Sequence, residues 1–190
     1  MTIDDSESLL VGNRNFTLEV VTAWLNSAVE SPTFWGHALI FSKQLPFHPF
    51  DGVGLYANGG PSIGTRLLLV GQQGLNTFSA TNGLNDNTLR LCSARRVGTT
   101  GTNPGELEVR VNGASSARQP LPTNMDLSAR GAGATIGGQR GETYQALSGT
   151  IAEVVYVIGD LSDQDLERLE RYLNEKYRLW APLTSREAAP

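Results

Sequence analysis

The chain has 190 residues, and a length of this order suits a single domain. Its formal net charge is −4, and its basic residues form no stripe that could neutralise phosphates, so nucleic acid is excluded as an expected partner. The single cysteine, Cys92, excludes an internal disulfide and a cysteine-based metal cluster.

The first segment, residues 1–15, is polar and acidic and predicts an arm that lies either on the body of its own chain or on a neighbouring chain. It lacks the basic and long apolar regions of a signal peptide. No stretch of the chain reaches the roughly 18 apolar residues that a membrane helix requires. We therefore expect a protein that is made in the cytoplasm and does not insert into a membrane, with incorporation into a virion or another particle left open.

The segment Phe16–Leu25 predicts the first strand, because apolar residues alternate along it. One face of this strand is expected to carry Phe16, Leu18, Val20, Thr22 and Trp24. Turn residues divide the middle of the chain into further short strands. These are expected at His37–Phe41, Val53–Tyr56, Thr65–Val70, Thr88–Val97, Glu106–Val111, within Ala114–Leu127, and at Ala134–Gly138. Cys92 falls inside one of them, which predicts a buried, inert thiol.

The strand Glu106–Val111 alternates charged and apolar residues, which is typical of a strand with one face on the core. The apolar side is expected to face that core. Glu106 and Glu108 are therefore expected to point to solvent. The Asn112-Gly113 pair that follows predicts a tight hairpin turn, because both residues tolerate positive φ.

The C-terminal part begins with Thr150–Ile158, which is rich in β-branched residues and predicts a buried strand. After a tight turn, Ser162 is expected to cap the N-terminus of a helix. The apolar stripe of this helix consists of Leu166, Leu169, Leu173 and Tyr177. We expect Trp180 to pack the end of the helix against the rest of the domain.

Together these signals amount to roughly nine or ten strands and one late helix. They predict an all-β fold, a two-sheet antiparallel jelly-roll sandwich with one C-terminal α-helix. No internal repeat and no linker divides the chain. Residues 16–180 are therefore expected to form one domain, between the arm at 1–15 and a polar tail at 181–190.

The stretch that begins at Gly149 reads G-x-I-A-E-V-x-x-Y, then a short turn, L-S-x-x-(D/E) and Y-L-x-x-K-Y. Its matching positions are Gly149, Ile151, Ala152, Glu153, Val154, Tyr156, Leu161, Ser162, Asp165, Tyr172, Leu173, Lys176 and Tyr177. This motif resembles the end of concanavalin A-like lectin/glucanase, or laminin G-like, jelly-roll domains of bacteria. The strand before Asn112-Gly113 and the stretch Ala134–Gly138 are similar to two further motifs of that family. The resemblance implies the sandwich fold, in a family that includes sugar binders, glycanases, adhesion modules and virion parts.

Sugar binding requires a flat aromatic face, together with amides and carboxylates that form hydrogen bonds with hydroxyl groups. Aromatic and polar residues gather in the first third of the chain, and an Asn-rich loop follows at Asn82–Asn87. The candidate ligand-binding residues are Trp35, His37, Asp51, Tyr56, Asn58, Asn85 and Asp86. The same residue types are also ordinary core aromatics and turn formers, so both readings stay open.

The leading interpretation is a non-catalytic carbohydrate-binding or recognition module, whose partner is a glycan. The alternative is a structural protein–protein module, such as a virion decoration or tail component held in a homo-oligomer or a larger assembly. A glycan hydrolase is a second alternative. It would need two carboxylates roughly 5–5.5 Å apart for a retaining mechanism, and no E-x-D-x-x-E run provides them.

No cofactor is expected. His37 and His48 lack the spacing of a zinc site and have no neighbouring cysteine. A calcium site built from Asp51, Asp86 and loop carbonyls stays an alternative, because Ca²⁺ prefers oxygen ligands.

Overall fold

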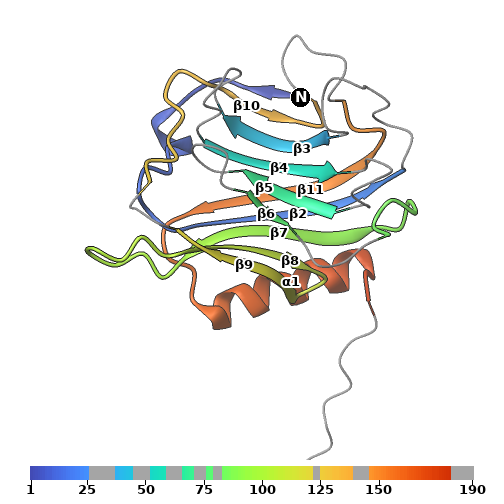
Figure 1. The fold of residues 1–190 in the computed structure, drawn as a ribbon. Helices are drawn as coiled ribbons and strands as arrows, with labels where there is room; N and C mark the ends of the chain where they lie inside the picture. Colours follow the sequence, from blue (N-terminus) through green and yellow to red (C-terminus); the bar gives the residue numbers. More distant parts are fainter. Residues whose placement is uncertain are drawn as a thin grey trace, which may run out of the picture.

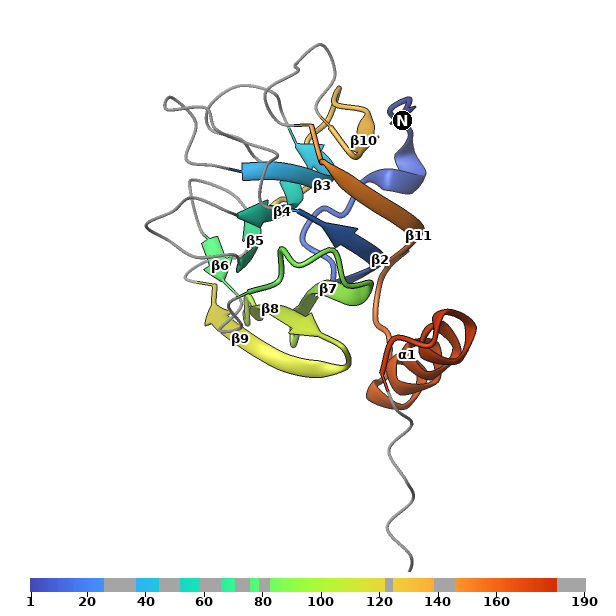
Figure 2. The ribbon, with the colours of Figure 1, turned by 90° about the vertical axis from the view of Figure 1, so that its right-hand side faces the viewer.

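The computed structural model describes residues 1–25, 37–44, 52–58, 66–70, 76–78, 83–121, 125–138 and 146–180, with the backbone alone for His37, Asn58, 66–70 and 76–78. In these residues two antiparallel sheets lie face to face, and one α-helix covers the outer face of one sheet (Figures 1 and 2). The predicted two-sheet sandwich with a C-terminal helix is confirmed.

The described strands are between 2 and 10 residues long. Their bounds are β1 (Thr2–Ile3), β2 (Phe16–Trp24), β3 (His37–Gln44), β4 (Gly52–Asn58), β5 (Arg66–Val70), β6 (Asn76–Phe78), β7 (Arg90–Val97), β8 (Glu106–Val111), β9 (Ala114–Pro120), β10 (Ala134–Ile136) and β11 (Gly149–Ile158). The helices are η1, a 3₁₀ turn (Glu7–Leu9), and α1 (Asp163–Tyr177). One sheet has the order β1-β10-β3-β4-β5-β6 and the other the order β11-β2-β7-β8-β9.

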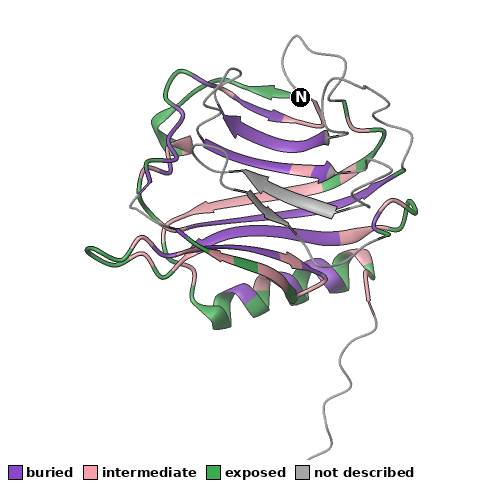
Figure 3. Cartoon of the chain, in the orientation of Figure 1, coloured by how far each residue is buried: buried purple, intermediate pink, exposed green. Residues whose placement is uncertain are grey.

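The core between the sheets follows from the alternation along each strand. Phe16, Leu18 and Val20 of β2 are 0% exposed, and Trp24 of the same face is 2% exposed. These residues belong to one buried cluster together with apolar residues of β3, β4, β7 and β8 (Figure 3). Cys92 lies in this cluster, and burial raises the pKa of its thiol to about 12. The predicted inward face of β2 and the buried, inert thiol are both confirmed.

The helix α1 closes the outer face of the five-stranded sheet (Figure 2). Ser162 caps it as predicted, because its Oγ accepts a hydrogen bond from the Asp165 N–H at 3.1 Å. Leu173 packs with Val21 and Leu91 in a second, smaller buried cluster. Partly buried side chains against that cluster include Leu169, Tyr177 and Trp180, so the predicted packing of Trp180 is confirmed.

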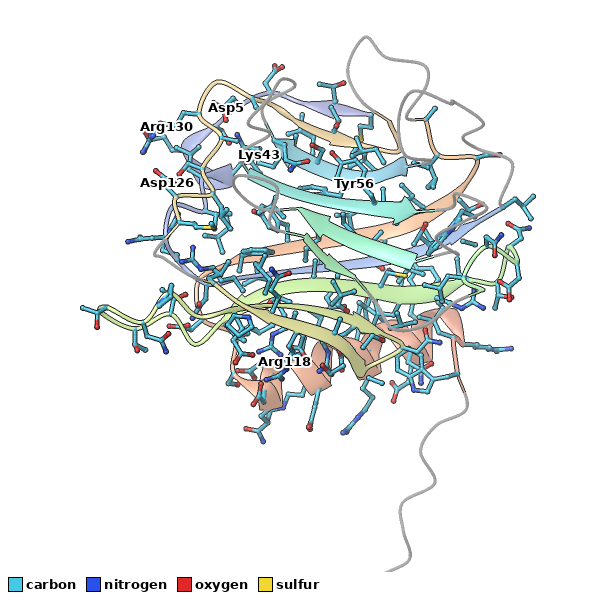
Figure 4. The ribbon with its side chains drawn as sticks, in the orientation of Figure 1. Asp5, Lys43, Tyr56, Arg118, Asp126 and Arg130 are labelled. Atoms are coloured by element: carbon cyan, nitrogen blue, oxygen red, sulfur yellow. The ribbon has the colours of Figure 1, made fainter. Side chains whose placement is uncertain are left out.

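The N-terminal arm lies on its own chain. The amino group of Met1 donates to the Ile136 carbonyl at 2.9 Å, and β1 pairs with β10. The ammonium group of Lys43, whose side chain is 0% exposed, donates to Asp5 of the arm at 2.7 Å (Figure 4). Val11 is fully buried in the core. Within this single chain, the arm thus packs against β10, Lys43 and the core.

The turn after β8 has the backbone that its residues predict. Asn112 and Gly113 have φ of 50° and 77°, as a hairpin turn with two left-handed residues requires. Among the described helices, none combines the length and the apolar character needed to cross a bilayer.

Candidate functional site

Residues of the predicted sugar site converge at one end of the sandwich. His37 starts β3, Asn58 ends β4, and the two are partners in the register of these strands. Asp86 forms an isolated bridge with Leu25, immediately after β2. In Figure 1 the start of β3 and the ends of β2 and β4 lie on the same side of the sandwich. The backbones of His37 and Asn58 and the Asn85-Asp86 pair therefore share one end.

A chain of backbone hydrogen bonds connects the two sheets at this end. Leu25 N–H donates to the Ser148 carbonyl at 3.2 Å, and Leu147 N–H donates to the Gly137 carbonyl at 3.0 Å. Gly137 N–H in turn donates to Ile40 of β3 at 3.0 Å. The end of β2 and the first half of β3 are thus linked through the segment that leads into β11.

Tyr56 sits on β4, two residues before Asn58, and its hydroxyl donates to Gln44 Oε1 at 2.6 Å (Figure 4). Burial raises the pKa of this hydroxyl to about 12. Gly54 makes room for the pair, since a Cβ there would lie 2.1 Å from Gln44 Oε1. The ring of Tyr56 therefore lies over Gly54 and reaches toward Gln44, away from the end of the sheet where Asn58 pairs with His37.

Asp86 is held by Arg90. Its two carboxylate oxygens accept from Arg90 Nη1 at 2.6 Å and from Nη2 at 2.8 Å, and Oδ1 also accepts from the Thr88 N–H at 2.9 Å. The hydrogen bond from Arg90 holds the pKa of Asp86 well below its usual range. Asn87 N–H donates to the Trp24 carbonyl at 3.0 Å and fixes the loop on β2. The carboxylate of Asp86 is therefore rigid and ionised.

Two of the seven predicted residues, Trp35 and Asp51, lie outside the described residues. The calcium alternative depends on Asp51 and stays a prediction for the same reason. Within the described ranges, no group of three or more His, Cys, Asp or Glu gathers in the way that a metal site requires.

A cluster that the sequence did not predict lies between α1 and the five-stranded sheet. This ionic cluster consists of Arg95, Glu108, Arg110, Arg118 and Glu170. Glu108 is 0% exposed, with Arg118 Nη2 at 3.1 Å, Arg110 Nη1 at 3.5 Å and Arg95 Nε at 3.6 Å from its carboxylate. The expectation that Glu108 points to solvent was wrong, because α1 covers that face of β8. Glu106 has a 41% exposed side chain and agrees with the expectation.

Glu19 lies beside the ionic cluster and is 1% exposed. Its carboxyl group accepts a hydrogen bond from the hydroxyl of Ser93. Burial raises the pKa of Glu19 to about 8. A carboxyl with such a pKa is a common feature of catalytic acids. In this chain it lies under α1, where a substrate cannot reach it.

The sequence carries one signal for the ionic cluster. Glu170 falls next to the apolar stripe of α1, and Arg110 and Glu108 alternate on the face of β8 that is not apolar. These opposite charges on α1 and on β8 predict an ion pair only if the helix is known to dock on that face of the sheet. That docking depends on the order of the strands, which periodicity does not reveal.

No protein-family profile matches the chain. No curated protein matches it either. Solved structures do match, so the likeness lies in the fold and not in a detectable sequence family.

A proposed carbohydrate-binding protein from Bacteroides ovatus superposes with a TM-score of 0.60 and 17% identity, over 88% of this chain and 43% of that one. A heptameric SAP-like pentraxin from Limulus polyphemus has a TM-score of 0.53 and 15% identity, over 85% of this chain and 69% of that one. A structure of botulinum neurotoxin type C, described by its interaction with two ganglioside molecules, has a TM-score of 0.54 and 10% identity, over 84% and 36%. The chain thus spans less than half the length of the first and third of these proteins. At these identities the likeness shows the fold alone, and that fold is consistent with a concanavalin A-like sandwich.

Proposed function

We propose that this chain is a non-catalytic carbohydrate-binding module. Its fold is shared with the proposed carbohydrate-binding protein of Bacteroides ovatus and with a toxin described by its binding of gangliosides. Fold alone does not determine function, so the proposal rests on the site. The observation that carries it is the convergence of His37, Asn58 and the Asn85-Asp86 pair at one end of the sandwich.

The proposed ligand-binding residues are those expected from the sequence. Asn58 and Asn85 carry amides that both donate and accept, and Asp86 offers a carboxylate held in place by Arg90. Trp35 would provide the aromatic surface for the apolar side of a sugar ring, and the ring of Tyr56 would have to turn away from Gln44 to join it. Asp51 completes the set. A rigid polar rim beside aromatic rings is the arrangement that recognition of a sugar requires.

The absence of catalysis is supported by the place of the acids. The carboxyl groups of Glu19 and Glu108 are buried under α1, Glu170 is buried on the face of α1 that meets the sheet, and the last two are paired with arginines. A hydrolase needs two carboxyl groups facing a groove that admits the substrate. Among the described residues, Glu108 and Glu170 instead pair with arginines between the sheet and α1.

The test is a glycan array followed by titration of the responding glycan. Trp35→Ala should weaken binding about tenfold or more, because a buried aromatic side chain contributes roughly 1.5–3 kcal/mol. Tyr172→Ala is the matched control, since this ring is 52% exposed and belongs to α1, which contributes no residue to the proposed site. Uniformly absent responses across diverse glycans would contradict the proposal, and so would equal binding by both variants.

Assembly with other chains is the second candidate function, and one observation favours it. β11 is the outermost strand of its sheet and runs for 10 residues, with Val154–Ile158 only partly buried. Long outer strands with apolar residues are templates for pairing with another chain. Size measurement at micromolar concentration separates the two functions, because a defined oligomer is required only for assembly. A virion decoration or tail component is the specific form of this alternative.

A further inference from the structure

Two clefts open at the opposite end of the sandwich from the proposed sugar site. They have volumes of about 420 and 300 Å³ and share Asn15, Gly159 and Asp160, and we call them the Asn15 clefts. Three segments meet there: the end of the N-terminal arm, the finger between β7 and β8 (residues 98–105), and the turn between β11 and α1. Figure 1 shows the finger projecting at the left, on the side where β2 starts and β11 ends.

Asn15 ties the three segments together. Its Nδ2 donates to Oδ1 of Asp160, and its Oδ1 accepts from the Thr99 N–H at 3.2 Å. Its carbonyl oxygen accepts from the Gly159 N–H at 2.8 Å. Since these bonds already order the floor of the clefts, a ligand would not lose affinity through ordering the loops.

The finger is anchored from inside the domain. Arg96, which is 0% exposed, donates from Nε and Nη2 to the Pro104 carbonyl at 3.2 and 3.0 Å. Its Nη1 donates to the Met125 carbonyl at 2.7 Å. The hydroxyl of Thr99 also donates to Pro104, at 3.2 Å. The base of the finger is therefore held by three hydrogen bonds to the Pro104 carbonyl, and the Met125 carbonyl fixes the guanidinium that donates two of them, so the wall that the finger forms is preorganised.

The walls of the clefts are polar and carry both signs of charge. Arg14 and Asp160 line the larger cleft, and Arg95, Asp160 and Asp163 line the smaller one. An anion would meet the carboxylates, and a cation would meet the guanidinium groups. Hydroxyl groups both donate and accept, so they match both kinds of wall. This balance favours a neutral, hydroxyl-rich ligand.

Two groups at the clefts can exchange their present contacts for a ligand. Arg95 Nη2 donates to Asp163 Oδ1 over a long 3.3 Å, and the side chain of Asp163 is 89% exposed. In the part of the chain that the structure describes, Asp160 uses Oδ1 for Asn15 and has no contact recorded at Oδ2. A pair of adjacent hydroxyls could accept from the arginine and donate to the aspartate.

Three glycines leave the backbone of the clefts uncovered. Gly98, Gly101 and Gly159 have φ of +74°, +52° and +119°, and a Cβ on any of them would meet nothing within 4 Å. Each lines at least one of the clefts. Glycines that are required by backbone conformation and also face open space permit close approach of a ligand to the main chain.

We propose that the Asn15 clefts are a second binding site, for a neutral saccharide, separate from the site that contains His37 and Asn58. The class of ligand rests on the proposed function, whereas the location rests on the cleft geometry alone. Asn13 stands at the mouth of the larger cleft, is exposed, and has no hydrogen bond recorded within the described residues. It is the position at which the site can be blocked without disturbing the floor.

The experiment is a ¹⁵N–¹H NMR titration of the full chain with maltotriose, cellotriose, chitotriose and lactose, and with sialyllactose as the charged comparison. A neutral saccharide should shift the amides of Thr99, Gly101 and Gly159, and Asn13→Trp should remove these shifts. Thr102→Trp, at the exposed tip of the same finger, is the matched control and should leave them unchanged. Asp160→Asn keeps an acceptor for Asn15 but loses the second carboxylate oxygen, so it should weaken binding about tenfold.

The outcomes separate the two proposals. Shifts confined to Tyr56, Asn85 and Asp86 would support the proposed function and overturn the second site. Shifts confined to the Asn15 clefts would support the second site and contradict the placement of the first. Shifts caused by sialyllactose alone, or none in any titration, would overturn the inference of a neutral ligand.

Discussion

Arg110 of β8 reaches α1 and donates two hydrogen bonds to Glu170, from Nε at 2.9 Å and from Nη2 at 3.2 Å. The two side chains are only 13% and 7% exposed. Arg110 also donates to the carbonyl of Gly113 in the turn after its own strand. One guanidinium group thus joins the helix, the strand and the hairpin turn.

Loss of one partner of this pair should cost much more stability than loss of a surface pair. Arg110→Met leaves Glu170 buried without its charge partner, and the free energy of unfolding should fall by about 3–5 kcal/mol. Urea unfolding followed by circular dichroism measures the change. Arg168→Met removes the exposed pair with Asp165, whose side chains are 65% and 52% exposed, and should cost about 0–1 kcal/mol. Equal losses in the two variants would contradict a structural role for the ionic cluster.

The buried Glu19 makes stability depend on pH in an unusual direction. Its carboxyl has an ordinary pKa of 4.5 when unfolded and of about 8 when folded, so the folded state binds the proton more tightly. The group therefore lowers stability progressively as the pH rises from about 4.5 to about 8, and the full loss is present above that range. Burial is the largest cause of the raised pKa, Glu170 adds to it, and the opposing effects of Ser93, Arg110 and Arg95 do not offset it.

Glu19→Gln tests this dependence, because the amide keeps the shape of the side chain and does not ionise. The variant should gain stability relative to the parent at alkaline pH and show no such gain at acid pH. Urea unfolding at a series of pH values provides the comparison. The hydrogen bond from Ser93 can be retained, since the amide oxygen also accepts. An identical slope of stability against pH for the two proteins would refute the raised pKa.

Patterns within one element were predictable from the sequence. The alternation along β2 predicted its buried face, Ser162 predicted the start of α1, and Asn112-Gly113 predicted the hairpin turn. Each of these depends on residues that are close in the sequence, where sterics and local hydrogen bonds decide the conformation.

Contacts between distant elements were not predictable. Glu108 is buried because α1, some 60 residues further on, crosses its face of the sheet. Asn15, Thr99 and Asp160 meet because β2 pairs with β11 on one side and with β7 on the other. The Asn15 clefts are therefore a product of topology. The predicted sugar site stays a proposal, supported by the register of β3 and β4, which pairs His37 with Asn58. Strand propensity alone does not determine that register.

The N-terminal arm should detach when its buried anchor is removed. The Lys43 ammonium donates to Asp5 Oδ1 at 2.7 Å, to the Ala129 carbonyl at 3.0 Å and to the Ala132 carbonyl. Lys43→Met leaves these acceptors unsatisfied and should cost about 3–5 kcal/mol of stability. Hydrogen exchange should accelerate at Ile136 N–H, which donates to the Met1 carbonyl.

Lys176→Met is the control for that experiment. Its ammonium pairs with Glu153 at 2.9 Å, and the side chains are 42% and 24% exposed. This replacement should change stability by about 0–1 kcal/mol and leave exchange at Ile136 unaltered. Unchanged exchange at Ile136 in Lys43→Met would show that the arm does not depend on the anchor.

Two glycines of the finger should differ in their tolerance of a methyl group, although their backbones are alike. Gly98 and Gly105 have φ of +74° and +79°, so alanine costs about 1–2 kcal/mol at either position through the left-handed conformation alone. At Gly98 the Cβ would meet nothing within 4 Å, whereas at Gly105 it would lie 2.3 Å from the Val97 carbonyl oxygen. Gly105→Ala should therefore lose roughly a further 1–3 kcal/mol by overpacking, as measured by urea unfolding. The carbonyl of Gly105 also accepts a hydrogen bond from the Leu121 N–H at 2.9 Å, which helps to hold the base of the finger. Gly105→Ala should therefore weaken saccharide binding at the Asn15 clefts as well. Equal stability of Gly98→Ala and Gly105→Ala would mean that the finger is not packed against the end of β7.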